Sequence, residues 1–428
     1  MTNTLAIFGL LIVLMAIGMP VGVALGLTVL SFMFIFTDVP LESVALKMFT
    51  GIEKFEIMAI PFFILAGNFL THGGVARRMI NFATSMVGHL RGGLGMSAVL
   101  ACALFAAVSG SSPATVVAIG SILIPAMIKQ GYPLRFGAGV VASAGGLGIL
   151  IPPSIVMVMY SVTTNTSVGA LFMAGVIPGL LLAFMLGLCT WYVAHKNNYP
   201  TLPRTSWAER IKHFRKAFWG LMLIVVVMGG IYSGMFTPTE AAAMSAVYAF
   251  IIAVFVYKDL TFKQIPRVLL DSANMSAMLL FIIASAVLFS FILTSEQIPQ
   301  RMADAIVASG MGPIGFLIVV NLLLLVAGAL MEPSSIILIL APILFPVAVA
   351  LGIDPIHFGV MIVVNMEIGM ITPPVGLNLF VASGITKAGL TEMSKAVMPW
   401  LVTMLVFLML ITYIPSISTF LPKALGVM

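Results

Sequence analysis

Ten long apolar runs dominate this chain, and few charged residues interrupt them. The runs lie at about 5–36, 57–72, 93–128, 136–162, 170–194, 218–257, 275–294, 313–350, 358–386 and 397–420. A helix needs ~20 mainly apolar residues to cross a bilayer. Charged residues make up only 8% of the chain, whereas soluble domains carry about 25%. The solvent is therefore lipid, and the sequence predicts an all-α polytopic membrane protein.

The two longest runs divide at prolines, and the N-terminus shows no sign of a leader. We split 5–36 at Met19-Pro20 and 218–257 at Phe236-Thr237-Pro238. The first ten residues have no basic segment and no small-residue cleavage site. We therefore expect them to begin the first span and not a removable signal peptide.

Prolines and glycines recur along the chain at a nearly constant offset. Pro125 and Pro346 are 221 residues apart, and so are the two Pro-Pro pairs, Pro152-Pro153 and Pro373-Pro374. Matched landmarks at one offset predict a duplicated fold of the kind found in transporters. The predicted first repeat, linker and second repeat are 1–194, 195–216 and 217–428.

The basic residues indicate that the second repeat is inverted. With the linker placed inside, each repeat crosses the membrane five times and contains one run that enters and leaves on the same face. The inside loops are then 73–92, 129–135, 195–216, 258–271 and 387–395. They hold all of the 20 Lys and Arg residues except Lys47, Lys54, Arg301 and Lys423. This bias follows the positive-inside rule and places both termini outside.

Three stretches have the spacing of helices that lie along the membrane surface. Two of them, 41–56 and 262–276, occupy matching positions before the third crossing of each half. Their apolar residues recur every three or four positions, as in an amphipathic helix. The third is the linker, whose apolar residues are Trp207, Ile211 and Phe214. We expect all three stretches at the interface, with a plain connecting loop as the alternative for the first two.

The runs 93–128 and 313–350 each contain a polar interruption. The first interruption is Ser-Gly-Ser-Ser-Pro-Ala-Thr at 109–115, and the second is Met-Glu-Pro-Ser-Ser at 331–335. Irregular backbone at membrane depth is tolerated only where it is buried in protein or lines a water-filled cavity. The sequence therefore predicts two re-entrant hairpins with their tips near the midplane. Pairs of ordinary helices kinked at proline are the alternative.

The runs 136–162 and 358–386 contain the Pro-Pro pairs and are predicted to be broken helices. A proline lacks the backbone N–H and clashes with the preceding turn. A break leaves C=O groups unpaired at one helix end and N–H groups unpaired at the next helix start. Carbonyls beside hydroxyls suit Na⁺, whereas N–H groups at the positive end of a helix dipole suit a carboxylate.

The residues at these four interruptions supply the candidate ligands. The candidates for sodium are Ser109, Ser112, Gly145, Gly148, Glu332, Pro333, Gly369 and Thr372. The candidates for a carboxylate substrate are Ser111, Ser112, Thr115, Pro153, Ser154, Ser334, Ser335, Pro374 and Asn378. The serines also suit helix capping within the hairpins, which is compatible with binding.

Glu332 and Glu367 are the only acidic residues predicted deep in the membrane. Burying an ionised carboxylate there costs ~2.5–3.5 kcal/mol on insertion scales, so such residues usually serve a function. Glu332 stands at a hairpin tip, where we expect a cation or substrate. Glu367 suits a functional role and a structural role as an acceptor for exposed N–H groups equally well.

Several catalytic motifs are absent, so the chain is not expected to be an enzyme. The sequence contains no G-x-x-x-x-G-K-[ST], no H-E-x-x-H and no nucleophile elbow. Any energy for transport must therefore come from an ion gradient or a partner. A membrane-embedded lipid transferase or hydrolase would need clustered carboxylates or histidines at one interface, and the sequence has no such cluster.

Five motifs follow one another along the chain: AIPFFILAGN at 59–68, GSSPATVVAIGS at 110–121, GGLGILIPPS at 145–154, MEPSS at 331–335 and GMITPPVGLNLF at 369–380. In this order and spacing they resemble the motifs of the large membrane subunit of tripartite ATP-independent periplasmic (TRAP) transporters. The resemblance spans essentially the whole chain. It implies a sodium-coupled elevator in the bacterial inner membrane, with periplasmic termini. The implied substrate is a small carboxylate, either a C4-dicarboxylate or sialic acid.

The resemblance also implies two protein partners, a small four-helix membrane subunit and a periplasmic substrate-binding protein. The small subunit is expected as a separate chain, because the sequence starts directly with a span. The main alternative is a single-component sodium–carboxylate symporter, whose inverted-repeat plan is similar. Dependence on a binding protein distinguishes the two.

Overall fold

The computed structural model describes residues 2–37, 40–308 and 310–427, and the regular elements among them are all helices. The first half contains α1 (Thr2–Ala16), α2 (Val21–Phe36), α3 (Leu41–Ile52), η1 (Phe55–Met58), α4 (Ala59–His72), α5 (Val75–Val87), α6 (Gly93–Ser109), α7 (Ser112–Lys129), α8 (Leu134–Ala144), α9 (Leu147–Leu150), α10 (Ile155–Thr164) and α11 (Val168–Lys196). The second half contains α12 (Trp207–Tyr232), α13 (Pro238–Ile251), η2 (Ile252–Val256), α14 (Ile265–Ser295), α15 (Ile298–Ala308), α16 (Pro313–Leu330), α17 (Pro333–Ala350), α18 (Pro355–Gly369), α19 (Leu377–Thr386), α20 (Leu390–Tyr413) and α21 (Ser416–Ala424). The predicted all-α fold is confirmed.

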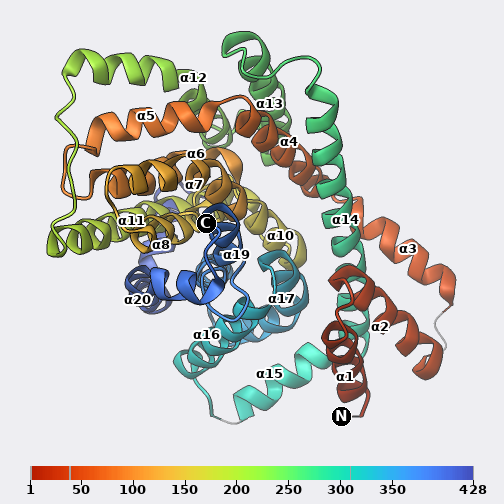
Figure 1. Ribbon diagram of the computed structural model, residues 1–428. Helices are drawn as coiled ribbons and strands as arrows, with labels where there is room; N and C mark the ends of the chain where they lie inside the picture. Colours follow the sequence, from red (N-terminus) through yellow and green to blue (C-terminus); the bar gives the residue numbers. More distant parts are fainter. Residues whose placement is uncertain (1, 38–39, 309, 428) are drawn as a thin grey trace.

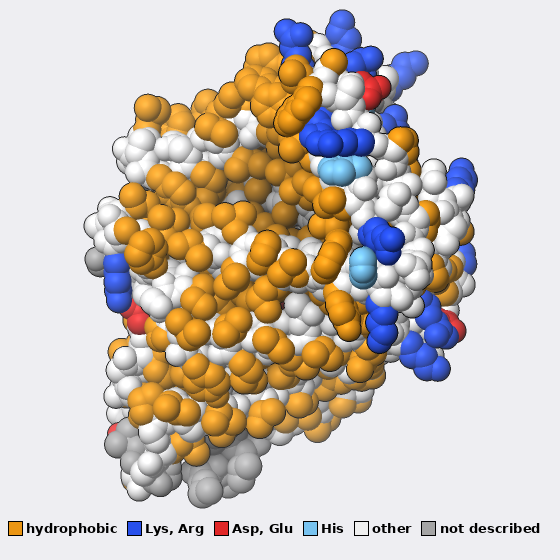
Figure 2. All heavy atoms as spheres, turned by 90° about the vertical axis from the view of Figure 1, so that its left-hand side faces the viewer, with side chains coloured by type: hydrophobic (Ala, Val, Ile, Leu, Met, Phe, Trp, Pro, Cys, Tyr) orange, Lys and Arg blue, Asp and Glu red, His pale blue; other side chains and the backbone are white. Residues whose placement is uncertain are grey.

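Nine of the described helices are long and apolar enough to cross a membrane, or ten if the bent helix pair counts as one span. Figure 2 shows a broad apolar face, with Lys and Arg side chains mostly along one edge of it. Large hydrophobic side chains are freely exposed at the surface of the protein, among them Leu180 and Phe184 of α11. Such exposure suits lipid and not water.

Both predicted hairpins are present. In the first, α6 and α7 join at Gly110 and Ser111, and Gly110 takes the left-handed φ of +61° that glycine adopts without strain. In the second, α16 and α17 join at Met331 and Glu332. A proline lies in the first turn of α7 and of α17, where its missing N–H needs no helical partner.

Both predicted broken helices are also present, and they form the centre of the molecule. In the first, the helical segment through α8 and α9 bends by 41° at the break before α10. In the second, a non-helical stretch separates α18 from α19. Both Pro-Pro peptide bonds are cis. Every residue from Phe136 to Ala144 and from Ile356 to Gly369 is buried, so α8 and α18 form the core.

The predicted linker 195–216 is shorter in the structure. Helix α12 begins at Trp207, and the non-helical connection after α11 covers only 197–206. Helix α12 begins this early because Ser206 caps it by accepting a hydrogen bond from the Glu209 N–H at 3.3 Å. A search for apolar runs does not detect such a cap. The apolar residues named for this segment remain exposed, with Trp207 at 70%, Ile211 at 57% and Phe214 at 43%.

The two predicted interfacial stretches differ from each other. The stretch 41–56 contains the separate helix α3, as expected, but 262–276 does not form a helix of its own. It is the first part of α14, which runs unbroken for 31 residues. Pro266 lies in the first turn of α14, and no glycine or proline follows it in the helix, so nothing interrupts the helix. Figure 1 shows α14 passing between α1–α3 and the rest of the molecule.

Glycines set how closely the hairpins approach the broken helices. A Cβ at Gly148 would lie 2.6 Å from the Ser111 carbonyl oxygen and 2.9 Å from the Ser112 nitrogen, at the first hairpin tip. A Cβ at Gly369 would lie 2.6 Å from the Gly328 carbonyl carbon in α16. These two glycines are 221 residues apart. In each repeat, the glycine at this equivalent position therefore allows the backbone of the broken helix to contact the backbone of the hairpin.

We predict that Gly148→Ala and Gly369→Ala each destabilise the protein by ~1–3 kcal/mol, because the added methyl meets backbone that cannot rotate away. Gly187→Ala and Gly384→Ala are the controls, since an added Cβ at either has nothing within 4 Å. Thermal unfolding in detergent should show lower midpoints for the first pair only. Equal midpoints for all four variants would contradict the close approach.

Candidate functional site

A cavity of about 330 Å³ lies where the two hairpin tips meet. Its lining comes from both hairpins, both broken helices and α14: Gly110, Ser111, Ser112, Pro113, Ala114, Val117, Ile149, Ile155, Val156, Met275, Met278, Leu279, Glu332, Pro333, Ser334, Met370 and Leu377. Its volume is within the range of small-molecule sites, and it is mainly apolar with a few polar groups. The two hairpin tips therefore border the same space.

The first hairpin tip is held by its own hydroxyl groups. The Ser109 and Thr115 hydroxyls are 2.9 Å apart, and Thr115 also donates to the Ser111 carbonyl at 2.8 Å. Ser111 and Ser112 line the cavity. Thr115 is buried inside the hairpin and does not line it. The structure therefore brings Ser111 and Ser112 to the cavity and places Thr115 behind them, where its hydroxyl holds the turn of the hairpin.

Asn378 joins the second repeat to the first hairpin. Its side-chain nitrogen lies 2.8 Å from the Ser112 hydroxyl and donates to the Ala142 carbonyl at 3.1 Å. Asn378 is fully buried at the start of α19 and does not line the cavity. It therefore ties α19, α7 and α8 together directly behind the cavity wall.

The first break places its predicted residues around the hairpin tip. Gly148 contacts the backbone of Ser111 and Ser112, as described above, and the Gly145 carbonyl accepts the Gly148 N–H at 2.9 Å. The Ser154 hydroxyl donates to the Ile149 carbonyl at 2.6 Å, so it bridges the break. Ser154 also caps α10. Pro153 is buried, and neither it nor Ser154 lines the cavity.

The second break is arranged differently. Glu332, Pro333 and Ser334 line the cavity, and the Ser335 hydroxyl donates to the Glu332 carboxylate at 3.0 Å. The break itself pairs with the hairpin arm, because the Val375 N–H donates to the Ala329 carbonyl at 3.1 Å. Among the remaining predicted residues, the Thr372 hydroxyl donates to the Ile368 carbonyl at 2.7 Å, and Gly369 packs on α16. Pro374 is exposed and does not line the cavity.

Glu367 lies at the contact between the two repeats. It is fully buried on α18, and its carboxyl group faces Gly146, where a Cβ would lie 2.6 Å from the Glu367 Oε1 atom. Neither oxygen has a hydrogen-bond partner among the residues that the structure describes. The sequence left two roles open for Glu367, a functional one and a structural one as an acceptor for exposed N–H groups. The structure does not show Glu367 in the structural role.

Two buried oxygens beside the breaks lack partners as well. The Ser143 hydroxyl, in the last turn of α8, and the Asn365 side-chain oxygen on α18 have no hydrogen-bond partner in the described part of the chain. These residues are 222 apart, close to the repeat offset. An orphaned buried oxygen is costly unless an unseen group satisfies it. Each repeat thus offers a spare oxygen ligand on the buried helix that precedes its break.

A metal held by acidic or sulfur ligands does not fit this site. In the described ranges, no group of three or more His, Cys, Asp or Glu residues could hold an ion. Neutral carbonyl and hydroxyl oxygens are the ligands present, and these suit a hard monovalent cation. The buried oxygens without a partner in the described residues, the Ser143 hydroxyl in the first repeat and the Asn365 side-chain oxygen in the second, are available for this chemistry.

Sequence reasoning missed the wall that α14 provides. Met275, Met278 and Leu279 line the cavity opposite the hairpin tips. They lie on one face of α14 at helical spacing. Their residue types give no signal of binding, because methionine and leucine are common on any membrane helix. Only the packing of α14 against α17 shows that this face borders the site.

Residues 8–417 match the family described as the tripartite ATP-independent periplasmic transporter, DctM component. A C4-dicarboxylate TRAP transporter large permease protein, DctM, of Rhodobacter capsulatus is 67% identical over 99% of this chain and 100% of its own length. Its namesake in Pseudomonas aeruginosa is 56% identical over 94% of each chain. The sialic acid TRAP transporter large permease protein SiaM of Vibrio cholerae is 39% identical over 98% of each.

Among solved structures, the YdaH transporter of Alcanivorax borkumensis has a similar fold. The TM-score is 0.59 over 90% of this chain and 89% of that one, at 16% sequence identity. This likeness concerns the fold alone. The family match over nearly the whole length, together with the hairpins and breaks described above, shows that the chain belongs to the DctM-component family of TRAP transporters.

Proposed function

We propose that this chain is the transport-carrying subunit of a sodium-coupled importer of C4-dicarboxylates. The observation that supports it most is the meeting of two helix starts at one cavity. Ser112 and Pro113 at the start of α7, and Pro333 and Ser334 at the start of α17, all line it. The positive ends of two helix dipoles therefore face the same space, and a dicarboxylate has one carboxylate for each.

The choice of a C4-dicarboxylate over sialic acid rests on the relatives. The three that share 51–67% identity with this chain are each named as C4-dicarboxylate permeases, whereas the sialic acid permease shares 39%. The cavity also favours a compact substrate, because its polar lining is confined to the tips and its remaining lining is largely apolar. Sialic acid carries many hydroxyls that such walls cannot satisfy.

Sodium is the proposed coupling ion for a physical reason. A dianion in this cavity lies beside Glu332, whose carboxylate repels it. Cations at the breaks offset this repulsion, and the spare oxygens of Ser143 and Asn365 are suited to hold them. We propose one Na⁺ near Ser109, Ser112 and Gly148, and a second near Glu332 and Gly369. Binding of ion and substrate is then mutually favourable.

We also propose that the hairpins and broken helices move together against α14, as in an elevator. Asn378, Gly148 and Gly369 bind these elements into one unit by direct contacts. The opposing face of α14 presents Met275, Met278 and Leu279, which form no directional bonds and allow sliding. The proposed location is the bacterial inner membrane, with both termini in the periplasm.

The proposed partners are a small four-helix membrane subunit and a periplasmic binding protein that delivers the substrate. Reconstitution into proteoliposomes with each component omitted in turn tests this. Under an inward Na⁺ gradient, radiolabelled succinate should accumulate only when all three components and Na⁺ are present. Excess unlabelled malate should compete and sialic acid should not.

Two results of that experiment would contradict the proposal. Robust uptake by this chain alone would favour a single-component symporter. Competition by sialic acid and not by malate would overturn the substrate assignment. Replacing the Na⁺ gradient with a K⁺ gradient of equal size controls for the membrane potential and ionic strength.

A second prediction concerns the proposed first sodium site. Ser143→Ala should raise the Na⁺ concentration for half-maximal uptake roughly fivefold, since losing one oxygen ligand costs ~1 kcal/mol. Its thermal stability without Na⁺ should not fall, because the hydroxyl has no partner to lose. Ser97→Ala is the control, since that buried hydroxyl is bonded within α6 to Gly93 at 2.6 Å. An unchanged Na⁺ dependence in Ser143→Ala would remove this ligand.

A further inference from the structure

A second cavity, of about 380 Å³, adjoins the candidate site. Its polar lining comes from the end of α4, the start of α5, the middle of α7 and the loop after η2, and includes Thr71, His72, Arg77, Ser121 and Asp259. Thr71 and Arg77 flank the short turn between α4 and α5. The lining is thus far more polar than that of the cavity at the hairpin tips.

One face of α7 runs from the first cavity into the second. Pro113, Ala114 and Val117 line the cavity at the tips, whereas Val117 and Ser121 line the polar cavity. Residues four apart lie one above the other on a helix, so these positions form a single stripe. Val117 belongs to both cavities and is 45% exposed. The two spaces are therefore neighbours along α7, with Val117 between them.

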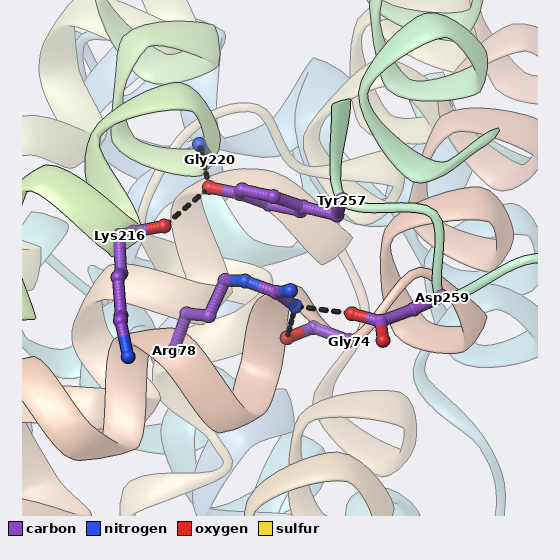
Figure 3. Close-up of polar contacts among 6 residues, drawn as sticks. All are labelled: Gly74, Arg78, Lys216, Gly220, Tyr257 and Asp259. Atoms are coloured by element: carbon purple, nitrogen blue, oxygen red, sulfur yellow. Dashed lines mark hydrogen bonds and ion pairs between the residues drawn. The ribbon is translucent and has the colours of Figure 1, made fainter. Parts of the chain in front are cut away.

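Arg78, the neighbour of Arg77, is fully engaged within the protein. Its guanidinium forms an ion pair with Asp259, donates to the Gly74 carbonyl at 2.9 Å and lies 3.9 Å above the Tyr257 ring. The Tyr257 hydroxyl in turn donates to the Lys216 carbonyl at 2.8 Å (Figure 3). This cluster fixes α5 to α12 and balances the charge of Asp259.

Arg77 makes none of the contacts that hold Arg78. Its side chain is exposed and lines the polar cavity, and it has no hydrogen-bond or ion-pair partner in the described part of the chain. Because Arg78 already balances Asp259, the charge of Arg77 is available to a ligand. A guanidinium binds a carboxylate through two parallel N–H donors. Ser121, across the cavity on α7, supplies a hydroxyl donor.

We propose that the polar cavity is an exit vestibule in which Arg77 transiently binds a carboxylate of the substrate after it leaves the hairpin tips. This inference rests on the proposed function and adds a second anion site to it. Arg77, in the first turn of α5, lies within the basic segment 73–92 that the sequence predicts to face the cytoplasm. An exposed arginine holds a carboxylate weakly in water, which suits a step from which the substrate must leave.

Substrate exchange in proteoliposomes that contain all three components tests this site. Liposomes are loaded with increasing internal succinate, and the exchange of external labelled succinate is measured as a function of the internal concentration. Arg77→Gln should raise the internal concentration for half-maximal exchange about threefold to fivefold, the upper part of the range for an exposed ion pair. Arg77→Lys should recover part of the loss, because lysine keeps the positive charge but lacks the two parallel donors. The effect should shrink in high internal salt, since screening weakens exposed charge pairs.

Arg91→Gln is the matched control, because Arg91 is also on the predicted cytoplasmic side but donates to Asn198 and lines neither cavity. It should leave the internal half-saturation unchanged, and all three variants should retain the wild-type melting temperature. Equal internal half-saturation in Arg77→Gln and wild type, or a loss that salt does not alter, would overturn the vestibule site. Failure of the wild-type complex to transport succinate would instead overturn the proposed function itself.

Discussion

Helices that end inside an apolar layer leave backbone N–H and C=O groups without partners, and the protein must satisfy each of them internally. The structure does this with groups that come from elsewhere in the chain. The Val375 N–H at the second break reaches the Ala329 carbonyl of the second hairpin, and the Ile155 N–H at the first break reaches the Gly110 carbonyl of the first hairpin at 3.5 Å. Each hairpin and its break therefore satisfy each other's backbone groups. The cavity for the substrate is the space that remains where they meet.

The repeat offset explains where this meeting point lies. Gly146 and Glu367 are 221 residues apart and contact each other. In an inverted repeat, a residue that touches its own equivalent must lie beside the pseudo-twofold axis. Gly146 directly precedes α9, so the start of α9 and the buried helix α18 meet at this axis. The symmetry is not complete, since the first Pro-Pro pair is buried and the second is exposed. Equivalent sites in the two repeats thus have different access to solvent or partners.

The central elements could be predicted because their sequence signals are local and strong. The Ser-Gly-Ser-Ser-Pro and Glu-Pro-Ser-Ser tips, and both Pro-Pro pairs, mark backbone that cannot continue a helix. Peripheral elements were harder. Helix α5 was read as part of a loop because Arg77 and Arg78 interrupt its apolar pattern, although its buried face recurs at helical spacing. The continuity of α14 and the early start of α12 depend on capping and on the absence of breakers, which a search for apolar runs does not register. No sequence signal marks the part of α14 that lines the cavity, because it contributes to the site only through where the helix packs.

The central claim is that one small dianion binds between the two hairpin tips, with cations at the breaks behind it. A high-resolution cryo-electron microscopy map of the complex in lipid nanodiscs, recorded with succinate in Na⁺ and again in K⁺, tests this most directly. The account predicts density for the dianion against Ser111, Ser112 and Ser334 in Na⁺ only, with ion density near Gly148 and Gly369. Substrate density at another place, or the same density at the tips in K⁺ without bound sodium, would contradict it.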